Sequence, residues 1–422
     1  MTSARTPSVR TPSVRTRFDA AITGIGLVTA AGGSTAATWE RLLAAEGTLC
    51  GPVPDLAPIP ADLGCAVTGF DPVAAVGRRK AWRLDRSSQL ALAAAAEALA
   101  DAGLDPAGWQ GARVGVVLGS GIGGAGTWER QHRVLLDQGP EKVSSLLIPM
   151  LAINMSAGYI AMEYGAQGPN FVTSTACASG TTAVGAAREL LRSGACDVVI
   201  TGGTEACLVP SIISGFSQMG ALSRRRDEPA RSSRPFDVDR DGFVPAEGAA
   251  VLVLERADDA RARGARVHAH VSGYGASADA HNATAPDPDG RGAELAVRAA
   301  LLDAGIAPDA VDHVNAHGTS TPLNDVAEAR LIRRVLGARP AVTSVKGVLG
   351  HALGAAGAIE AAVTALSLEH QVIPPTANLD SPDPQIDVDL VRKAPRTGRV
   401  DVALSNSFGF GGQNAALVLT RA

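Results

Sequence analysis

Short runs of apolar and often β-branched residues recur along the chain, each closed by glycine or by polar turn residues. Such runs are typical of strands that are buried within a sheet. The first covers residues 20–29 and ends in a glycine-rich stretch. Eight further runs predict strands in the same way, at residues 114–118, 197–203, 251–254, 267–274, 313–315, 342–345, 400–405 and 415–420.

Longer segments between these runs have the spacing of helices. They predict helices at residues 36–45, 87–102, 181–192 and 255–266. Strands that alternate with helices are typical of a layered α/β fold. The strand at 251–254 closes one series and the strand at 267–274 opens a second, although the pattern contains no clear internal repeat that links the two.

Composition narrows the class of protein. Of the 422 residues, 46% are apolar and 19% are charged, which is ample for a large buried core in one or two domains. The net charge of −4 gives no overall basic field for a nucleic acid or a membrane. No apolar run approaches the roughly 20 residues of a membrane span, so we expect a soluble protein. Residues 1–18 contain a repeated Arg-Thr-Pro-Ser-Val pentapeptide and are expected to form a disordered tail.

The cysteines indicate the redox environment. They are five in number, without CxxC spacing: Cys50, Cys65, Cys177, Cys196 and Cys207. An odd, scattered set indicates neither a disulfide framework nor a zinc ribbon. We therefore expect a reducing cytoplasm.

Cys177 is the candidate nucleophile. It lies in the run Val-Thr-Ser-Thr-Ala-Cys-Ala-Ser-Gly at 172–180, directly before the predicted helix at 181–192. A thiol at a helix N-terminus faces unpaired N–H groups, so we expect a lowered pKa. The small neighbours permit a sharp turn and a close approach of substrate. By itself this segment is equally consistent with a buried structural cysteine.

Three downstream segments add the partners that thioester chemistry needs. They are Val-Asn-Ala-His-Gly-Thr-Ser-Thr at 314–321, Val-Lys-Gly-Val-Leu-Gly-His-Ala-Leu-Gly at 345–354, and Ser-Asn-Ser-Phe-Gly-Phe-Gly-Gly-Gln-Asn at 405–414. With these motifs the chain resembles the β-ketoacyl-acyl-carrier-protein synthases, condensing enzymes of the thiolase superfamily, and among them the elongating type with a Cys-His-His triad. The resemblance runs from about residue 20 to about residue 419.

The resemblance implies a fold and a reaction. The fold is a five-layered α-β-α-β-α sandwich of two similar halves, which we place at 19–265 and 266–422, and the assembly is a dimer. Cys177 accepts an acyl chain from an acyl carrier protein; malonyl-carrier protein then loses its carboxylate, and the enolate attacks the thioester. Both substrates are carried on phosphopantetheine, and no separate cofactor or metal is implied.

The resemblance also assigns roles to individual residues. His317 and His351 donate Nε2–H bonds to the oxygen that becomes negative on decarboxylation. Lys346 forms a charge network with Glu360 behind the histidines. In the loop that begins at Phe408, Phe410 is a gate whose N–H completes an oxyanion hole with that of Cys177. The remaining matches are substrate contacts: Thr319 and Thr321 to the pantetheine arm, and Ile122 and Phe216 to the acyl chain.

Two basic clusters are candidates for carrier-protein docking, because carrier proteins are acidic and local fields steer association. The first is Arg78, Arg79, Lys80 and Arg83, and the second is Arg224, Arg225 and Arg226. Charge runs are also often plain solvated faces.

Two other kinds of site are rejected. His313 and His317 have the i, i+4 spacing of a helical metal site, but they flank a predicted strand, which would place them roughly 13 Å apart. Gly-Ser-Gly-Ile-Gly-Gly at 119–124 satisfies a dinucleotide-binding pattern, but no acidic residue follows about 20 positions later at a strand end.

Departures from the fatty-acid type leave the pathway open. The chain has Gly-Gly-Gln-Asn at 411–414 where GGTN is common, Thr181-Thr182 where a histidine often stands, and Leu349 where KxxTGH has threonine. The alternative is a type II polyketide ketosynthase, paired in a heterodimer with a chain-length factor instead of forming a homodimer. A thiolase is less favoured because residues 403–420 contain no second cysteine, and a non-catalytic scaffold because the triad is intact.

Overall fold

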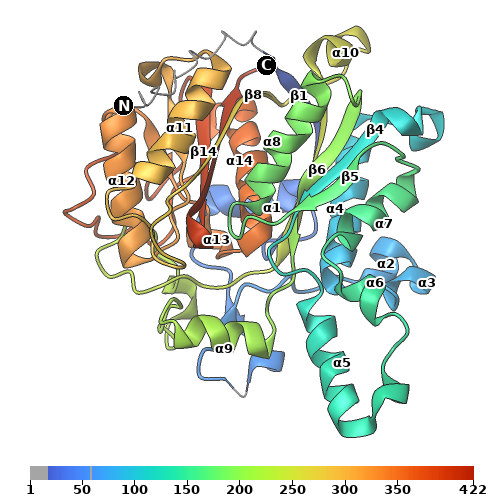
Figure 1. The fold of residues 1–422 in the computed structure, drawn as a ribbon. Coiled ribbons are helices and arrows are strands. Elements are labelled where there is room, and N and C mark those ends of the chain that lie inside the picture. The colour runs from blue at the N-terminus through green and yellow to red at the C-terminus, as the bar shows by residue number, and fades with distance from the viewer. Residues whose placement is uncertain (1–17, 58) are drawn as a thin grey trace, which may run out of the picture.

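The computed structural model describes residues 18–57 and 59–422 (Figure 1). Apart from Phe18, the predicted tail at 1–18 lies outside the described residues, as does the pentapeptide repeat within it. No helix in the described part of the chain is long and apolar enough to span a membrane.

Eleven strands form one mixed sheet in the order β12-β10-β9-β14-β15-β8-β1-β7-β6-β4-β5. Two short pairs, β2 with β3 and β11 with β13, stand apart from it. In chain order the strands are β1 (Ala20–Val28), β2 (Gly51–Pro52), β3 (Leu63–Gly64), β4 (Val114–Gly119), β5 (Asn170–Thr173), β6 (Val198–Glu205), β7 (Gly248–Arg256), β8 (Ala269–Ala278), β9 (His313–Asn315), β10 (Ala341–Thr343), β11 (Val372–Ile373), β12 (Asp389–Leu390), β13 (Arg396–Thr397), β14 (Val402–Gly409) and β15 (Gln413–Thr420).

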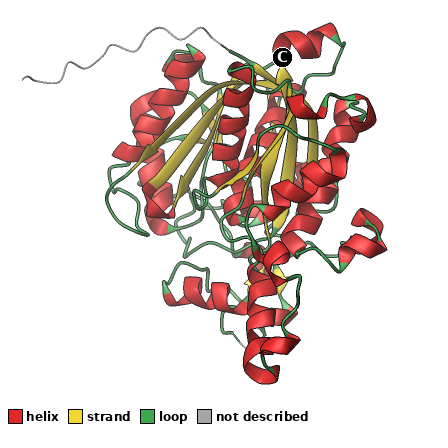
Figure 2. Ribbon diagram, turned by 45° about the vertical axis from the view of Figure 1, so that its right-hand side comes forward, coloured by secondary structure: helices red, strands yellow, loops and turns green. Residues whose placement is uncertain are grey.

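Helices cover the outer faces of the strands, and further helices lie between the strands of the two halves (Figures 1 and 2). In chain order they are α1 (Thr35–Ala44), α2 (Pro72–Val76), α3 (Arg78–Ala81), α4 (Arg86–Ala102), α5 (Ala125–Gln138), α6 (Leu147–Leu151), α7 (Met155–Tyr164), α8 (Ser179–Arg192), α9 (Pro210–Gln218), α10 (Ala257–Ala262), α11 (Arg291–Ala304), α12 (Pro322–Leu336), α13 (Lys346–Leu349) and α14 (Ala356–His370).

The predicted five-layered sandwich is confirmed. Helices α4 and α7 pack on the strands of the first half, and α11 packs on β8 and β15 of the second half with α12 beside it. Helices α8 and α14 contact strands of both halves and form the central layer (Figure 1). The ladder between the halves is continuous, because Ala20–Ile22 of β1 pairs with Ala269–Val271 of β8. The bounds 19–265 and 266–422 remain a prediction.

Glycine lets the two central helices approach closely at the level of the site. A Cβ at Gly180 of α8 would lie 2.6 Å from the Ala358 nitrogen, and one at Gly357 of α14 would lie 2.1 Å from Thr181 Oγ1. Real Cβ atoms do not tolerate such distances, so these positions require glycine. Helix α14 is buried on nearly every side, which is why helical periodicity did not reveal it.

One predicted element is wrong. The charged segment 255–266 was expected to be a helix, but β7 continues to Arg256 and the helix that follows, α10, ends at Ala262. Glu255 pairs with Ala21 of β1 on one side and with Val198 of β6 on the other. Pairing with two neighbouring strands therefore overrides the local preference for a helix. The predicted strands elsewhere are found, with ends shifted by a few residues.

Candidate active site

Cys177 lies in a tight turn between β5 and α8. The turn is closed by hydrogen bonds from Ala178 N to Thr175 O (3.0 Å) and from Ser179 N to Ala176 O (3.1 Å), while Ala176 adopts a left-handed φ of 49°. Ser179 Oγ also donates to Ala176 O and accepts from Thr175 N. The turn thus holds the cysteine on a constrained backbone directly before the central helix.

His317 follows β9, and a buried carboxylate fixes its backbone. Glu328 on α12 accepts from the backbone N–H of His317 (2.9 Å) and from that of Gly318 (2.8 Å). Asn406 Nδ2 donates to the same carboxylate. Glu328 was not identified from the sequence. The only indication there is that an acidic residue lies among the apolar positions of the segment that forms α12.

His351 follows α13 and is fixed by strand-like backbone contacts. Its N–H donates to Val244 O (2.8 Å), and its carbonyl accepts from Ala246 N (3.0 Å). Its ring packs edge-to-face on Phe243, with centroids 5.3 Å apart. Phe243 was also missed, because nothing in the sequence connects it with the later motif.

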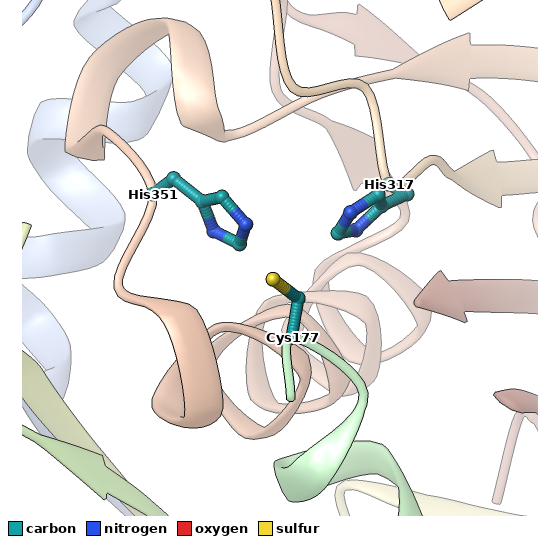
Figure 3. A group of neighbouring side chains, drawn as sticks. All are labelled: Cys177, His317 and His351. Carbon is teal, nitrogen blue, oxygen red and sulfur yellow. The ribbon is translucent and has the colours of Figure 1, made fainter. Parts of the chain in front are cut away.

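The three predicted triad residues converge (Figure 3). The thiol of Cys177 and one ring nitrogen from each of His317 and His351 all lie within 4.8 Å of one another. The two imidazoles are nearly perpendicular, at 82°, with centroids 5.3 Å apart. The sulfur points between them (Figure 3). One group bound to the thiol can therefore contact both rings.

Lys346 and Glu360 form the buried pair that the resemblance implies. Their side chains are ion-paired and almost inaccessible to solvent. Lys346 Nζ also donates to His317 O (2.6 Å) and lies 3.5 Å from His317 Nδ1. Because an ammonium has only donors, Nδ1 must accept, and the ring proton of His317 then resides on Nε2.

Both histidines are neutral at physiological pH. Burial, followed by the charge of Lys346, lowers the pKa of His317 well below its usual range. Burial and the Lys346 charge likewise lower the pKa of His351. Neutral imidazoles can donate an N–H to a developing oxyanion or accept a proton from a thiol.

The expected lowering of the Cys177 pKa is wrong for this state of the protein. Burial raises the pKa of the Cys177 thiol to about 12, which outweighs the opposing effects of the Lys346 charge and the Phe410 N–H. The N–H groups of Ala178 and Ser179 in the turn are bonded to carbonyls and do not offset this effect of burial. Proximity to a helix N-terminus therefore does not supply free donors to this sulfur.

A cavity of about 390 Å³ opens onto the triad. Its lining includes most of the predicted substrate and gate residues: Cys177, His317, His351, Phe216, Thr319, Thr321, Phe408 and Phe410. Lys346 and Glu360 lie behind the histidines instead. Ile122 packs in an apolar cluster with Cys177 and Phe216.

The loop that begins at Phe408 lies against the cysteine turn. A Cβ at Gly409 would be 2.7 Å from Thr175 O and 3.0 Å from the Cys177 nitrogen, so only glycine permits this approach. The N–H of Phe410 hydrogen-bonds to Cys177. The Phe410 ring lies 6.2 Å from that of Phe216, and Gly411 and Gly412 have left-handed φ values of 79° and 69°. The aromatic ring thus sits on a glycine-flanked backbone at the cavity wall.

Glu205 is a further buried carboxylate that the sequence analysis missed. It accepts from Gly121 N (2.7 Å), Ile122 N (3.2 Å), Ser120 Oγ (3.1 Å) and Gly354 N (3.0 Å). Burial raises its pKa to about 7 against the effect of these donors. It ties the loop that carries Ile122 to the segment after His351. The same carboxylate occupies the N–H groups that a dinucleotide phosphate would need.

Metal binding has one candidate group among the described residues, namely the triad itself. A soft cation could reach all three ligand atoms, but the raised pKa of Cys177 disfavours the thiolate that such a cation requires. His313, on β9, hydrogen-bonds through Nδ1 to Ala341 O and shares no site with His317.

The two basic clusters lie in different places. Arg224 and Arg226 line a hollow of about 290 Å³ that shares Gly220 and Phe243 with the active-site cavity. Within this cluster Arg226 pairs with Asp62, and Arg225 donates to Asp239 O. The other cluster, exposed Arg78, Arg79, Lys80 and Arg83, lies on and just after α3, and Lys80 pairs with Glu163 of α7. Of the two clusters, only the Arg224 cluster lines the hollow beside the cavity.

Comparison with known proteins identifies the family. Residues 18–260 match the N-terminal domain of beta-ketoacyl synthase, and residues 268–380 match its C-terminal domain. The chain belongs to the beta-ketoacyl synthase family. The 3-oxoacyl-[acyl-carrier-protein] synthase 2 of Synechocystis sp. is 43% identical over 95% of this chain and 97% of its own length. The protein of that name from Staphylococcus aureus is 42% identical over the same shares.

Solved structures of ketosynthases have the same fold as this beta-ketoacyl synthase. The ishigamide ketosynthase/chain length factor has a TM-score of 0.90 and 33% identity, covering 96% of this chain and all of that one. A beta-ketoacyl synthase from Burkholderia phymatum has the same TM-score and coverage with 35% identity. A type II polyketide acyl-carrier protein in complex with its ketosynthase, bound to the hexaketide, has a TM-score of 0.88 and 31% identity, covering 96% of this chain and all of that one.

Proposed function

We propose that this protein is a 3-oxoacyl-[acyl-carrier-protein] synthase that catalyses decarboxylative condensation of malonyl-carrier protein with an acyl chain held on Cys177. The observation that carries the proposal is the convergence of one thiol and two neutral imidazoles within 4.8 Å at the cavity. An acyltransferase class agrees with the names of its relatives.

Acylation begins with the Cys177 thiol. Since its pKa is raised, the proton must leave during attack, and a neutral imidazole within 4.8 Å is placed to take it. The new C–S bond to Cys177 forms as the C–S bond to the carrier-protein pantetheine breaks, and the imidazole gives its proton to the departing thiolate. The N–H groups of Cys177 and Phe410 hold the carbonyl oxygen in the tetrahedral intermediate.

Decarboxylation of the malonyl group then uses both histidines. Loss of carbon dioxide leaves negative charge on the malonyl thioester oxygen, and the Nε2–H groups of His317 and His351 donate to it. Lys346 holds His317 in the required tautomer. The resulting carbon nucleophile attacks the Cys177 thioester and releases the thiolate, which regains a proton.

Substrate entry uses the rest of the cavity lining. Thr319 and Thr321, whose hydroxyls are 2.8 Å apart, contact the pantetheine arm, and Phe216 and Ile122 contact the acyl chain. Phe410 moves aside to admit the chain to Cys177, and the glycines around it permit the movement. Phe408, 5.8 Å from the His317 ring, keeps that ring in place.

The partner proteins are an acyl carrier protein and a second ketosynthase-fold subunit. Arg224 is exposed and borders the hollow beside the cavity, which supports docking of an acidic carrier there. The outer edge of β5 ends the sheet, and Phe171 on it is exposed, which supports a dimer through this edge. We place the enzyme in the cytoplasm because all five cysteines are free thiols.

The second candidate is the ketosynthase subunit of a type II polyketide system. It is favoured by two of the solved structures, which are ketosynthases with a chain length factor. The higher identities, 41–43%, are to the enzymes named 3-oxoacyl-[acyl-carrier-protein] synthase 2, so the homodimeric enzyme is proposed first. Mass spectrometry of the products, with and without a candidate partner subunit, separates the two pathways.

The chemistry is tested with purified variants and two assays, transfer of an acyl group from the carrier protein and release of carbon dioxide from malonyl-carrier protein. Cys177→Ala should abolish acylation, and His351→Ala should lower decarboxylation by at least about 100-fold, as for loss of an oxyanion donor. The matched controls are Cys196→Ala and His132→Ala, which change a buried cysteine and an exposed histidine outside the cavity. Acylation of Cys177→Ala at the wild-type level would refute the proposal.

A further inference from the structure

Two cysteines outside the catalytic turn lie next to a short antiparallel pair of strands: Cys50 directly precedes β2, and Cys65 directly follows β3. In the antiparallel pair of β2 and β3, Pro52 lies opposite Leu63 and Gly51 lies opposite Gly64. Continuing this register by one residue places Cys50 opposite Cys65. Directly opposed residues of antiparallel strands have Cβ atoms about 4.5–5.5 Å apart, which brings their thiols within reach.

The contacts of the two thiols agree with this register. Cys50 packs against the buried cluster that contains Cys65, and the Cys65 side chain is the largest influence on the pKa of Cys50. Cys50 is partly exposed and its Sγ lies 2.9 Å from Pro229 O, whereas Cys65 is fully buried. They therefore form an inner and an outer thiol, with the outer one open to small solutes.

We propose that Cys50 and Cys65 are a redox-modification site, a dithiol that a hydroperoxide converts to a disulfide and that a small dithiol restores. Opposed positions on adjacent strands allow the sulfurs to approach to the bond length of about 2.05 Å that a disulfide requires. Neither cysteine belongs to the catalytic triad, so the site is separate from the condensation chemistry.

The reaction proceeds in two balanced steps. The Cys50 thiolate attacks the peroxide oxygen to give a sulfenic acid and releases water or an alcohol. The Cys65 thiol then attacks the sulfenic sulfur, and water leaves with formation of the S–S bond. Overall two thiols lose two electrons and two protons. The neighbouring Cys65 side chain lowers the pKa of Cys50 against the effect of burial, and burial raises the pKa of Cys65, so Cys50 reacts first.

The pair lies directly behind the segment that carries Lys346 and His351. Leu49 N donates to Val348 O (2.8 Å), and Thr48 Oγ1 donates to Gly347 O (2.9 Å). On the other strand, a Cβ at Gly350 would lie 2.6 Å from Cys65 Sγ. The residues before Cys50 are therefore hydrogen-bonded to α13, and Cys65 packs against Gly350, the residue before His351.

Formation of the disulfide should consequently disturb His351. Formation of the S–S bond moves Cys65 Sγ toward Cys50 and away from Gly350. Because Gly350 directly precedes His351, we expect the position of the histidine ring to change. We expect decarboxylation of malonyl-carrier protein to fall at least threefold on oxidation and to recover with dithiothreitol. This second consequence rests on the proposed function, whereas the disulfide itself does not.

The first experiment treats the full-length Cys177→Ala protein with hydrogen peroxide, so that the active-site thiol cannot compete. Free thiols are then alkylated under denaturing conditions, and a non-reducing digest is mapped by mass spectrometry. The expected product is one crosslinked peptide pair that contains Cys50 and Cys65, two hydrogens lighter than the reduced peptides. Cys196, buried elsewhere in the core, is the internal control and should remain alkylatable.

Variants make the result decisive. In Cys65→Ser, Cys50 should stop at the sulfenic or sulfinic acid, and in Cys50→Ala, at a partly exposed position that tolerates the change, Cys65 should remain reduced. Absence of the crosslinked peptide in the Cys177→Ala protein would overturn the site. A crosslink that leaves the rate of carbon dioxide release unchanged would overturn the coupling to His351 alone.

Discussion

At the scale of single residues, the environment of Cys177 decides how the reaction starts. Burial raises the pKa of the thiol and the neighbouring amides are bonded within the turn, so the thiol is neutral in the resting enzyme. Two neutral histidines and the Phe410 N–H face it. In the proposed reaction this arrangement activates the thiol only when a substrate arrives, which avoids a permanently reactive thiolate.

This state of Cys177 predicts the pH dependence of its alkylation. With a pKa of about 12, the thiolate fraction is small at pH 7, and the rate of reaction with iodoacetamide should rise about tenfold per pH unit between pH 7 and pH 9. The rate is measured by mass spectrometry of the Cys177 peptide. A plateau already reached at pH 7 would mean that the free enzyme holds a thiolate. Reaction at Cys50, the other partly exposed cysteine, is followed in the same digest as a reference.

At the scale of elements, the buried side chain of His268 connects helices and strands where β1 of the first half pairs with β8 of the second. His268 directly precedes β8, and its Nδ1 lies 2.6 Å from Glu369 of α14 while its Nε2 lies 2.7 Å from Asp101 of α4. Asp101 also accepts from Ile25 N of β1. Because both ring nitrogens face carboxylates, the imidazolium is the form that satisfies both. Four elements from three layers meet at this one charged group.

The junction predicts a pH-dependent stability. Burial opposes the charge on His268, but the hydrogen bonds to Asp101 and Glu369 outweigh it and raise the pKa of the ring. Its stabilising contribution is therefore complete below the unfolded-state pKa of about 6.5 and is lost as the pH rises through the folded-state value. His268→Gln should lower the free energy of unfolding by about 2–3 kcal/mol at pH 6.

Chemical denaturation at pH 6 and pH 9 measures the difference between wild type and His268→Gln. The difference should be smaller at pH 9 than at pH 6, because the wild-type ring loses its proton as the pH rises through its folded-state pKa. His132→Gln, at an exposed position on α5, is the control and should change stability at neither pH. An equal loss at both pH values would show that the ring acts through packing alone. Exposed Arg266, which also pairs with Asp101 and Glu369, is unchanged in both proteins.

At the scale of the whole molecule, the layers place the cavity mouth beside positive charge despite a net charge of −4. Arg224 borders the hollow next to the cavity, and no side-chain bond of its own is found within the described residues. Its guanidinium is thus free to pair with an acidic carrier protein. The α3 cluster has no such position at the mouth, which makes Arg224 the stronger docking candidate.

Arg224→Glu should therefore raise KM for malonyl-carrier protein about threefold to fivefold, with kcat little changed, as for loss of an exposed ion pair. The effect should shrink in high salt and be absent with a malonyl-pantetheine thioester, which lacks the carrier protein. Arg261→Glu, on α10 at the opposite end of the molecule from α9 (Figure 1), is the matched control. An equal effect of both variants would assign it to net charge and not to docking.

The sequence by itself identified the residues that the structure brings together at the cavity, and it predicted the α/β class of the fold. Cys177, His317, His351 and Lys346 stand in short motifs whose local geometry depends on neighbouring residues, and buried strands such as β1 and β9 have a strong apolar signal. Tertiary structure alone decided the rest. Glu205, Glu328 and Phe243 act through contacts with distant segments, β7 extends because two strands pair with it, and burial sets the pKa of Cys177 against the local expectation. Desolvation and long-range pairing depend on what surrounds a residue in space, and the local sequence does not contain that information.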